Sequence, residues 1–331
     1  MRIKQPRLED IYQAQYLIRD TIYQTPLLKS LRLSKYTGSE IFIKLEGLQV
    51  TGSFKIRGAT NRMLNLTREE KTRGVVAVSS GNHGRAVAFV ARNFEIPAVV
   101  CMSETVPANK VNAIRDLGAE VVIQGKTYDQ ATEIAMKLQK DRGLTMIHPF
   151  DDPYVIAGQG TIGLEIYHEL PHVNTVIVPL SGGGLLGGIA LALKSINPDI
   201  QTIGVSMDKG AVMAESLAAG KVVEITEEPS LADALVGGLG PENHYTFQLN
   251  QQYVDKTILV TEGEIAAGMT FALEVEHLVL EGGGAVGIAA LLAEKVKDIG
   301  ERAVLVLSGS NVGLGSLMEV AQGKYPYQNS L

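Results

Sequence analysis

The sequence predicts an α/β protein with two doubly wound parallel-sheet domains and a ligand site between them. Strand-like apolar runs alternate with helical patterns, glycine-rich turns follow several of these runs, and 331 residues provide for one or two domains. The expected strands are residues 41–45, 75–79, 98–102, 120–123, 146–148, 175–178, 202–205, 257–260 and 303–307. The helical patterns include residues 85–93, 108–117, 128–141 and 158–168, with Gly118 and Gly143 where C-caps are expected.

The order of these segments divides the chain into two predicted domains. Four expected strands with short links lie between residues 75 and 147, which is enough for a small sheet. Residues 149–153, with a proline at each end, then form the expected connection between the two domains. We therefore expect a small domain of residues 74–151 and a large domain of residues 1–73 plus 152–331.

Composition and charge argue against several classes of function. The net charge is −6 with scattered basic residues, and aromatic content is 5% with no tryptophan, so no nucleic-acid partner is expected. The uncharged stretch 173–193 contains Pro179 and several glycines, which indicates strand, turn and helix rather than a membrane span. With no signal peptide and a single cysteine, Cys101, a cytoplasmic location is expected.

Two segments carry the strongest chemical signal. Residues 51–59 place Lys55 in a mostly uncharged stretch, and an apolar pocket there would keep its amine neutral for Schiff-base chemistry. Residues 181–188 form a glycine-rich turn between a strand and a helix, where backbone N–H groups bind phosphate. A neutral lysine together with a phosphate cradle indicates pyridoxal 5'-phosphate as the cofactor.

Each signal alone also has an ordinary interpretation. A lone lysine is usually a solvated surface residue, and a glycine turn also serves dinucleotides, flavins or tight packing. The chain contains no G-x-x-x-x-G-K-[ST] motif and no G-x-G-x-x-G with an acidic residue at the usual spacing. These absences disfavour a P-loop protein and a nucleotide-binding dehydrogenase.

Further polar and glycine-rich segments lie next to expected strands or helices, at residues 79–84, 281–285 and 308–311. Ligands of open α/β sheets bind beyond the carboxyl ends of the strands, and the hydroxyls, amide and N–H groups of residues 79–84 suit a substrate carboxylate. Ordinary N-caps and turns are the alternative for each segment. The histidines show no metal-ligand spacing, so we expect no metal site.

Five segments in order resemble the fold-type II pyridoxal-phosphate family, which shares the tryptophan synthase β-like fold: residues 53–58, 79–84, 157–161, 181–184 and 308–311. The closest similarity is to the threonine and serine dehydratases and the serine racemases. The resemblance spans nearly the whole chain. It implies a large cofactor-binding domain, a small substrate-gating domain, and a homodimer or a dimer of dimers.

The resemblance also implies roles for individual residues. Lys55 would carry the cofactor as a Schiff base and act as general base, and Ser80 would be a second catalytic residue, at the place of a proton carrier in racemases. The cofactor would contact Lys55, Phe54, Asn82, Gly182, Gly183, Gly184, Leu185 and Ser308. The substrate would contact Ser79, Ser80, Asn82 and His83. The implied reaction eliminates water from a 3-hydroxy L-amino acid, which leaves a 2-oxo acid and ammonia.

Several positions depart from the family pattern. Ser206 stands where many relatives have a metal-binding glutamate, Gly282 stands where proline is usual, and residues 231–240 differ from common threonine dehydratases. Residues 231–240, together with Ser206 and Met207, resemble the hydroxyectoine-utilisation dehydratase branch, which implies a substrate other than threonine. A serine or hydroxyaspartate racemase and a β-replacement synthase are further alternatives. A cofactor-free binding protein on this fold would have lost Lys55.

Overall fold

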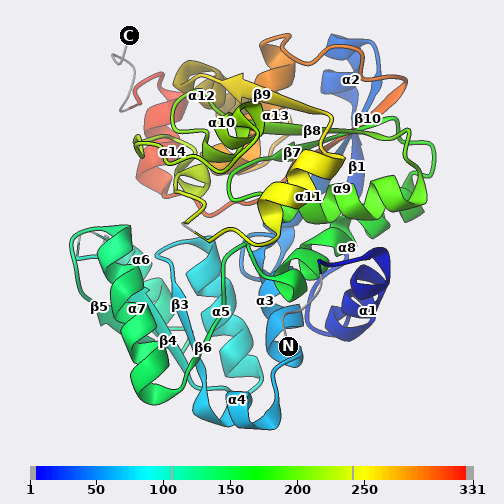
Figure 1. Ribbon diagram of the computed structural model, residues 1–331. Coiled ribbons are helices and arrows are strands. Elements are labelled where there is room, and N and C mark those ends of the chain that lie inside the picture. Colours follow the sequence, from blue (N-terminus) through cyan, green and yellow to red (C-terminus); the bar gives the residue numbers. More distant parts are fainter. Residues whose placement is uncertain (1–4, 105, 107, 241, 326–331) are drawn as a thin grey trace.

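The computed structural model describes residues 5–104, 106, 108–240 and 242–325. Within these residues the strands form two sheets (Figure 1). The larger sheet has the order β1-β2-β10-β7-β8-β9, and only the β1–β2 pair is antiparallel. Its strands are β1 (Leu27–Ser30), β2 (Glu40–Leu45), β7 (Thr175–Pro179), β8 (Gln201–Met207), β9 (Lys256–Val260) and β10 (Arg302–Leu307).

The smaller sheet is entirely parallel and has the order β5-β4-β3-β6. Its strands are β3 (Val75–Val78), β4 (Ala98–Met102), β5 (Glu120–Ile123) and β6 (Thr145–Met146). The central strand β3 is buried along its whole length, which explains its uninterrupted Val-Val-Ala-Val sequence. The predicted fold class, with two α/β domains and parallel sheets, is therefore confirmed.

Helices cover both sheets, and α3 packs against α5 and α8 (Figure 1). The helices up to the end of the smaller sheet are α1 (Leu8–Ile18), α2 (Leu31–Thr37), α3 (Lys55–Leu64), α4 (Arg68–Arg73), α5 (Asn82–Asn93), α6 (Ala108–Arg115) and α7 (Tyr128–Arg142). Those that follow are α8 (Pro153–Glu169), α9 (Gly184–Ile196), α10 (Val212–Ala219), α11 (Thr246–Tyr253), α12 (Glu262–Glu274), α13 (Gly282–Leu292) and α14 (Leu314–Ala321). Two 3₁₀ turns are η1 (Glu46–Leu48) and η2 (Asp233–Leu235).

Local sequence explains where several helices begin and end. Asp152 caps α8 by accepting hydrogen bonds from two backbone N–H groups, and Pro153 occupies the first helical position. Thr261 and Glu264 form a capping box at the start of α12. Gly143 ends α7 in the left-handed conformation, as the sequence predicts.

Helix α3 packs against elements of both sheets. On one side, Gly58 and Gly158 bring the backbones of α3 and α8 into direct contact, because a Cβ on Gly158 would lie 2.7 Å from Arg57 O. On the other side, Ile56 and Met63 pack into the apolar core around β3 and α5. This arrangement places the first residue of α3, Lys55, between the two sheets.

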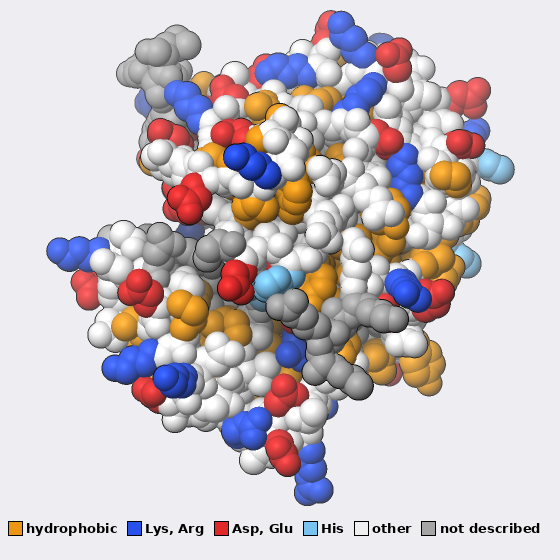
Figure 2. All heavy atoms as spheres, in the orientation of Figure 1, with side chains coloured by type: hydrophobic (Ala, Val, Ile, Leu, Met, Phe, Trp, Pro, Cys, Tyr) orange, Lys and Arg blue, Asp and Glu red, His pale blue; other side chains and the backbone are white. Residues whose placement is uncertain are grey.

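The predicted domain boundaries agree in order with the two sheets, since all four strands of the smaller sheet lie within residues 75–146. The boundaries at residues 74 and 151 stay a prediction. In the part of the chain that the structure describes, no helix combines the length and apolarity required to cross a bilayer. Figure 2 shows positive and negative side chains interspersed over the visible face.

Candidate active site

Lys55 lies where segments from both ends of the chain meet. The preceding Phe54 donates its backbone N–H to Ser308 O at 3.1 Å, and Ser53 pairs with Gly309 in an isolated β-bridge. Residues 308 and 309 directly follow β10, at the carboxyl end of a central strand. The structure therefore brings Lys55 and Ser308 together at the sheet edge where parallel α/β proteins bind ligands.

Lys55 is half-buried, and its amine has no carboxylate in direct contact among the described residues. Its Nζ donates to the backbone oxygen of Pro149 at 2.8 Å and lies 5.2 Å from the centre of the Phe54 ring. Burial lowers the pKa of Lys55 from its usual 10.5 to about 8, and the charge of Glu281 acts in the opposite direction. A substantial neutral fraction near pH 7–8 follows, which is the form that reacts with an aldehyde.

The segment after β6 links Lys55 to the glycine loop. His148 Nδ1 accepts the backbone N–H groups of Phe150 and Asp151, at 3.3 and 2.8 Å, so its proton resides on Nε2. Burial lowers the pKa of His148 to about 4, which keeps this acceptor neutral. The Phe150 ring then packs on Gly182 so closely that a side chain at Gly182 would overlap it.

The glycine loop has the geometry of an anion cradle. Gly183 is the N-cap of α9 with φ 82°, a left-handed conformation that favours glycine, and no side chain caps the helix there. The N-cap Gly183 has no side chain that could accept from the first N–H groups of α9, and the helix dipole adds positive potential there. Gly182, Gly183, Gly184 and Leu185 are thus suited to hold a phosphate.

Asn82 and His83 open helix α5 on the other side of the site. Asn82 Nδ2 donates to Glu281 Oε1 at 2.7 Å, and Asn82 Oδ1 accepts from Asn311 Nδ2 at 2.6 Å. His83 Nε2 lies 2.8 Å from Ile147 O, so it carries the proton. Burial, followed by the charge of Lys55, lowers the pKa of His83 to about 3, which leaves a neutral imidazole.

Glu281 is a buried carboxyl group that the sequence analysis did not assign to the site. Burial and, secondarily, the charge of Asp233 raise the pKa of Glu281 to about 7, while the hydrogen bond from Asn82 favours the ionised form. Its glycine-rich turn is visible in the sequence, but a turn of this kind gives no sign that the carboxyl group faces Asn82. His148 and Phe150 were missed for the same reason.

The two serines at the end of β3 lie at the N-terminus of α5. Ser79 Oγ accepts the N–H of Gly81 at 3.2 Å, and both Ser79 and Ser80 are half-buried. Ser308 is buried, and its Oγ donates weakly to Gly283 O at 3.5 Å. Asn82 Nδ2 lies 3.3 Å from where a Cβ of Gly309 would be, so the start of α5 closely approaches the segment that follows β10.

Gly282 allows an unusually close contact between two loops. A Cβ on Gly282 would overlap the carbonyl of Leu231 and lie 2.8 Å from the backbone nitrogen of Ala232. The next residues form η2, where Asp233 pairs with Lys110 of α6 at 3.0 Å. The two departures from the family pattern noted in the sequence, at Gly282 and in residues 231–240, are therefore in contact with each other.

A buried charge cluster anchors α3 behind the site. The guanidinium of Arg57 forms ion pairs with Glu46 at 2.8 Å and with Glu165 at 2.5 Å, and Lys44 pairs with Glu165 at 2.7 Å. All four side chains are nearly inaccessible to solvent. Because Arg57 follows Lys55 by two residues on α3, this cluster restrains the helix that carries the amine.

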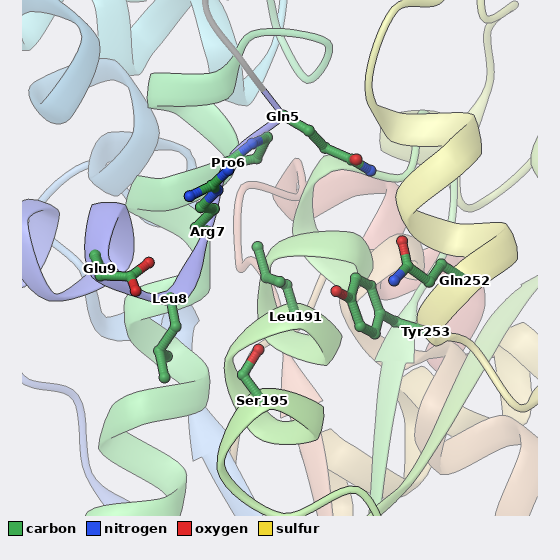
Figure 3. Close-up of a pocket in the computed structure, with 9 residues that line it drawn as sticks. All are labelled: Gln5, Pro6, Arg7, Leu8, Glu9, Leu191, Ser195, Gln252 and Tyr253. Atoms are coloured by element: carbon green, nitrogen blue, oxygen red, sulfur yellow. The ribbon is translucent and has the colours of Figure 1, made fainter.

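An open cavity of about 630 Å³ lies elsewhere, between the N-terminal segment, α9 and α11 (Figure 3). Its lining includes Arg7, Leu191, Ser195 and Tyr253, and none of the candidate site residues. Ser195 is eleven residues along α9 from Gly184, about 16 Å at the rise of an α-helix. The cavity therefore lies toward the opposite end of α9 from the glycine loop.

Comparison with known proteins agrees with this geometry. The sequence model described as pyridoxal-phosphate dependent enzyme matches residues 18–309. An L-threonine ammonia-lyase of Thermotoga maritima is 44% identical over 310 residues, covering 94% of this chain and 77% of the relative. Among solved structures, maize serine racemase superposes with a TM-score of 0.90 at 33% identity, covering 96% of this chain and 97% of the racemase. The processed form of threonine deaminase isoform 2 from Solanum lycopersicum gives a TM-score of 0.88 at 36% identity, covering 97% of this chain and 96% of the deaminase.

The chain belongs to the pyridoxal-phosphate-dependent enzyme family. Within that family it is related to the threonine ammonia-lyases and serine racemases, as the resemblance in the sequence indicates. The donor set fits pyridoxal 5'-phosphate: an amine of lowered pKa, backbone N–H groups at α9 for the phosphate, and the neutral Ser308 hydroxyl. Ser53 lies two residues before Lys55, and its buried Oγ has no hydrogen-bond partner among the described residues.

Proposed function

We propose that this protein is a pyridoxal-phosphate-dependent ammonia-lyase that dehydrates a 3-hydroxy L-amino acid, threonine or serine in type, to a 2-oxo acid and ammonia. The observation that carries this proposal is the Lys55 amine, connected through Pro149 and Phe150 to the anion-binding turn at Gly182. The names of the relatives, L-threonine ammonia-lyase and threonine deaminase, support the same reaction class.

The cofactor would be held by residues from both sheets. Lys55 would carry it covalently and Phe54 would lie against it, while the backbone of Gly182, Gly183, Gly184 and Leu185 would hold its phosphate. Asn82 and Ser308 would bind its ring substituents. When bound, pyridoxal phosphate accepts the negative charge that develops on the α-carbon of the substrate.

Lys55 Nζ is the group that would move the proton. With a pKa of about 8, the neutral amine removes the α-proton of the substrate and later returns a proton. The carbonyl of Pro149 orients Nζ at 2.8 Å without supplying a charge that would hold the amine protonated. A carboxylate partner in this place would raise the pKa and reduce the fraction of active base.

The substrate carboxylate would bind at the start of α5. The helix N-terminus and the hydroxyl groups of Ser79 and Ser80 provide donors for an anion, and Asn82 adds an amide. His83 is neutral, so it contributes hydrogen bonding without a net charge. This binding would present the α-proton to Lys55 and orient the β-hydroxyl for departure.

Atoms and charges balance in this elimination. The α C–H bond breaks and its proton passes to Lys55, the β C–O bond breaks, and the leaving hydroxide becomes water with the one proton that Lys55 gives back. The remaining 2-aminoalkenoic acid tautomerises to an imine, which water hydrolyses to the 2-oxo acid and ammonia.

Two alternatives within the same family remain to be separated by substrate. Ser80 would serve as the second proton carrier of a serine or hydroxyaspartate racemase, and the structural similarity to maize serine racemase favours this test. The second alternative is a hydroxyectoine-utilisation dehydratase, which is tested with its own amino acid. Gly282 contacts Leu231, and Asp233 acts on Glu281, so the loop that distinguishes this branch lies beside Glu281.

We also propose a cytoplasmic homodimer, or a dimer of dimers. Large apolar side chains are exposed on β1, α2 and the η1 region, beside the edge of the larger sheet, and a second copy would cover them. They are Leu28, Leu31, Tyr36, Leu48 and Val50. Sedimentation equilibrium of the wild type and of Leu31→Glu tests this: dissociation of the variant supports the assembly, and a monomeric wild type overturns it.

The function is tested by measuring 2-oxo acid and ammonia from L-threonine, L-serine, threo-3-hydroxyaspartate, 3-phenylserine and a hydroxyectoine-derived amino acid. Turnover with equal amounts of both products supports the lyase and identifies the preferred side chain. Failure of all five, with cofactor still bound, contradicts the lyase. Racemisation without 2-oxo acid, followed by chiral chromatography, would assign the racemase instead.

A further inference from the structure

Asn250 on α11 is fully buried against the glycine loop. Its Nδ2 donates to Gly183 O at 2.9 Å and to Thr246 O at 2.7 Å. A Cβ on Gly183 would overlap this nitrogen, and a Cβ on Gly187 would lie 3.0 Å from it. The side chain of Asn250 is thus fitted to the backbone of the loop that precedes α9.

The orientation of the Asn250 amide follows from its partners. Both neighbours of Nδ2 are carbonyl oxygens, so an oxygen in its place would face two acceptors. The other amide atom, Oδ1, is buried without a hydrogen-bond donor among the described residues. A leucine would fill a similar volume without an unpaired Oδ1, but it would lose both hydrogen bonds from Nδ2, including the one that reaches the glycine loop.

We propose that Asn250 is a positioning residue for the phosphate of the cofactor. Together with the N–H of Gly187, which donates to the same oxygen at 2.8 Å, Asn250 fixes the Gly183 carbonyl so that the N–H groups of Gly184 and Leu185 stay available for the anion. Glycine in a left-handed conformation is easily rotated, and rotation of this peptide would direct a carbonyl dipole at the phosphate.

Helix α11 is itself tied to the segment that contacts Lys55. The carboxylate of Asp151 accepts the backbone N–H groups of His244, Tyr245 and Thr246, at 2.7, 2.9 and 2.9 Å. Asp151 follows Phe150, whose backbone oxygen lies 2.9 Å from where a Cβ of Gly184 would be. The hydrogen bonds to Asp151 therefore fix the helix that carries Asn250 relative to the cofactor site. A positioning residue requires such a fixed support.

The test compares Asn250→Leu and Asn250→Asp with a matched control, Thr202→Val. Thr202 is buried, and its Oγ1 donates to Tyr253 O at 2.6 Å at the far end of α11, away from the glycine loop. Each holoenzyme is dialysed to equilibrium against set concentrations of pyridoxal phosphate, and the Kd is obtained from bound cofactor. The ³¹P chemical shift of the bound phosphate is a second readout, independent of turnover.

We expect the Kd for pyridoxal phosphate to rise at least about tenfold in both Asn250 variants, with a displaced ³¹P resonance, and to stay within about twofold in Thr202→Val. Asn250→Asp keeps the shape of the side chain, so the Kd and the ³¹P shift can be measured on it if Asn250→Leu does not fold. A Kd and ³¹P shift in Asn250→Asp equal to those of Thr202→Val would overturn the proposal. So would an equal loss of affinity in all three variants.

Discussion

Asn82 Nδ2 donates a 2.7 Å hydrogen bond to Glu281 Oε1 although the two residues are 199 positions apart in the sequence. Asn82 begins α5, which packs on the smaller sheet, and Glu281 is the N-cap of α13, which packs on the larger one. This single contact therefore joins the two halves of the molecule directly beside the candidate cofactor site. The ionised carboxylate is the better acceptor for Asn82, whereas burial favours the protonated form.

The raised pKa of Glu281 predicts a pH-dependent stability difference. Its folded pKa of about 7 exceeds the usual 4.5, so its contribution is fully present below pH 4.5 and is lost as the pH rises through 7. Relative to Glu281→Gln, the wild type should lose about 3 kcal/mol over this range. Urea unfolding of both proteins at pH 4.5, 6 and 7.5 measures the difference, and a constant difference would contradict the assignment.

Lys55 predicts the complementary behaviour in the cofactor-free protein. Its folded pKa of about 8 is below the usual 10.5, so its contribution is present above pH 10.5 and is lost as the pH falls through 8. Cofactor-free Lys55→Met should therefore be more stable than the cofactor-free wild type at pH 7.5, by about 3 kcal/mol more than at pH 10.5. Denaturant unfolding at the two pH values measures this, with the exposed Lys221→Met as the control for removing a positive charge. Equal pH trends in the two variants would refute the prediction.

Arg57 should be essential to the anchoring of α3. Replacing it with leucine leaves the carboxylates of Glu46 and Glu165 buried without their guanidinium partner, which costs about 3–5 kcal/mol. The exposed pair of Arg142 and Glu120 provides the contrast, since Arg142→Ala removes only a solvent-screened ion pair and should cost far less stability than Arg57→Leu. Both values come from urea unfolding, and similar costs for the two variants would show that the buried cluster has no special role.

Gly282 should tolerate no side chain. Gly282→Ala places a methyl group on the Leu231 carbonyl, whereas the nearest atom to a methyl group in Gly283→Ala is Leu235 Cγ at 3.3 Å. We expect Gly282→Ala to lower stability by about 1–3 kcal/mol and to raise the KM more than it lowers kcat, because residues 231–235 must move away from Glu281. Gly283→Ala should change both quantities less. Thermal unfolding and steady-state kinetics of the two variants measure these changes. Equal stability, KM and kcat in the two variants would contradict the close contact.

Local patterns predict much of this fold because the relevant physics is local. The run Glu-Val-Val-Ile predicts a strand with the same bounds as β5, and the uncharged stretch 173–193 does form strand, glycine turn and helix. Strand β1 was missed because it is a four-residue antiparallel edge strand with half of its residues exposed. The glycine-rich turn expected over residues 181–188 is shorter in the structure, because α9 already begins at Gly184. Gly187 and Gly188 have low helix propensity, but they pack closely on α11 and α8.

The candidate site divides in the same way. The turn at Gly182–Gly184 and the lysine at residue 55 can be recognised in the sequence, because a short local motif carries the chemistry of each. Glu281, His148 and Asn250 were missed because their significance depends on which distant segment folds against them. The roles assigned to the individual site residues stay predictions.

The central claim is that Lys55 carries the cofactor and moves the α-proton. The most direct test measures 2-oxo acid formation from the preferred substrate by wild type and Lys55→Ala, both saturated with pyridoxal phosphate. We predict a loss of at least about a thousandfold in kcat for the variant, the combined effect of losing covalent attachment and general base. Retention of more than about a tenth of the wild-type kcat, with pyridoxal phosphate bound, would contradict the account.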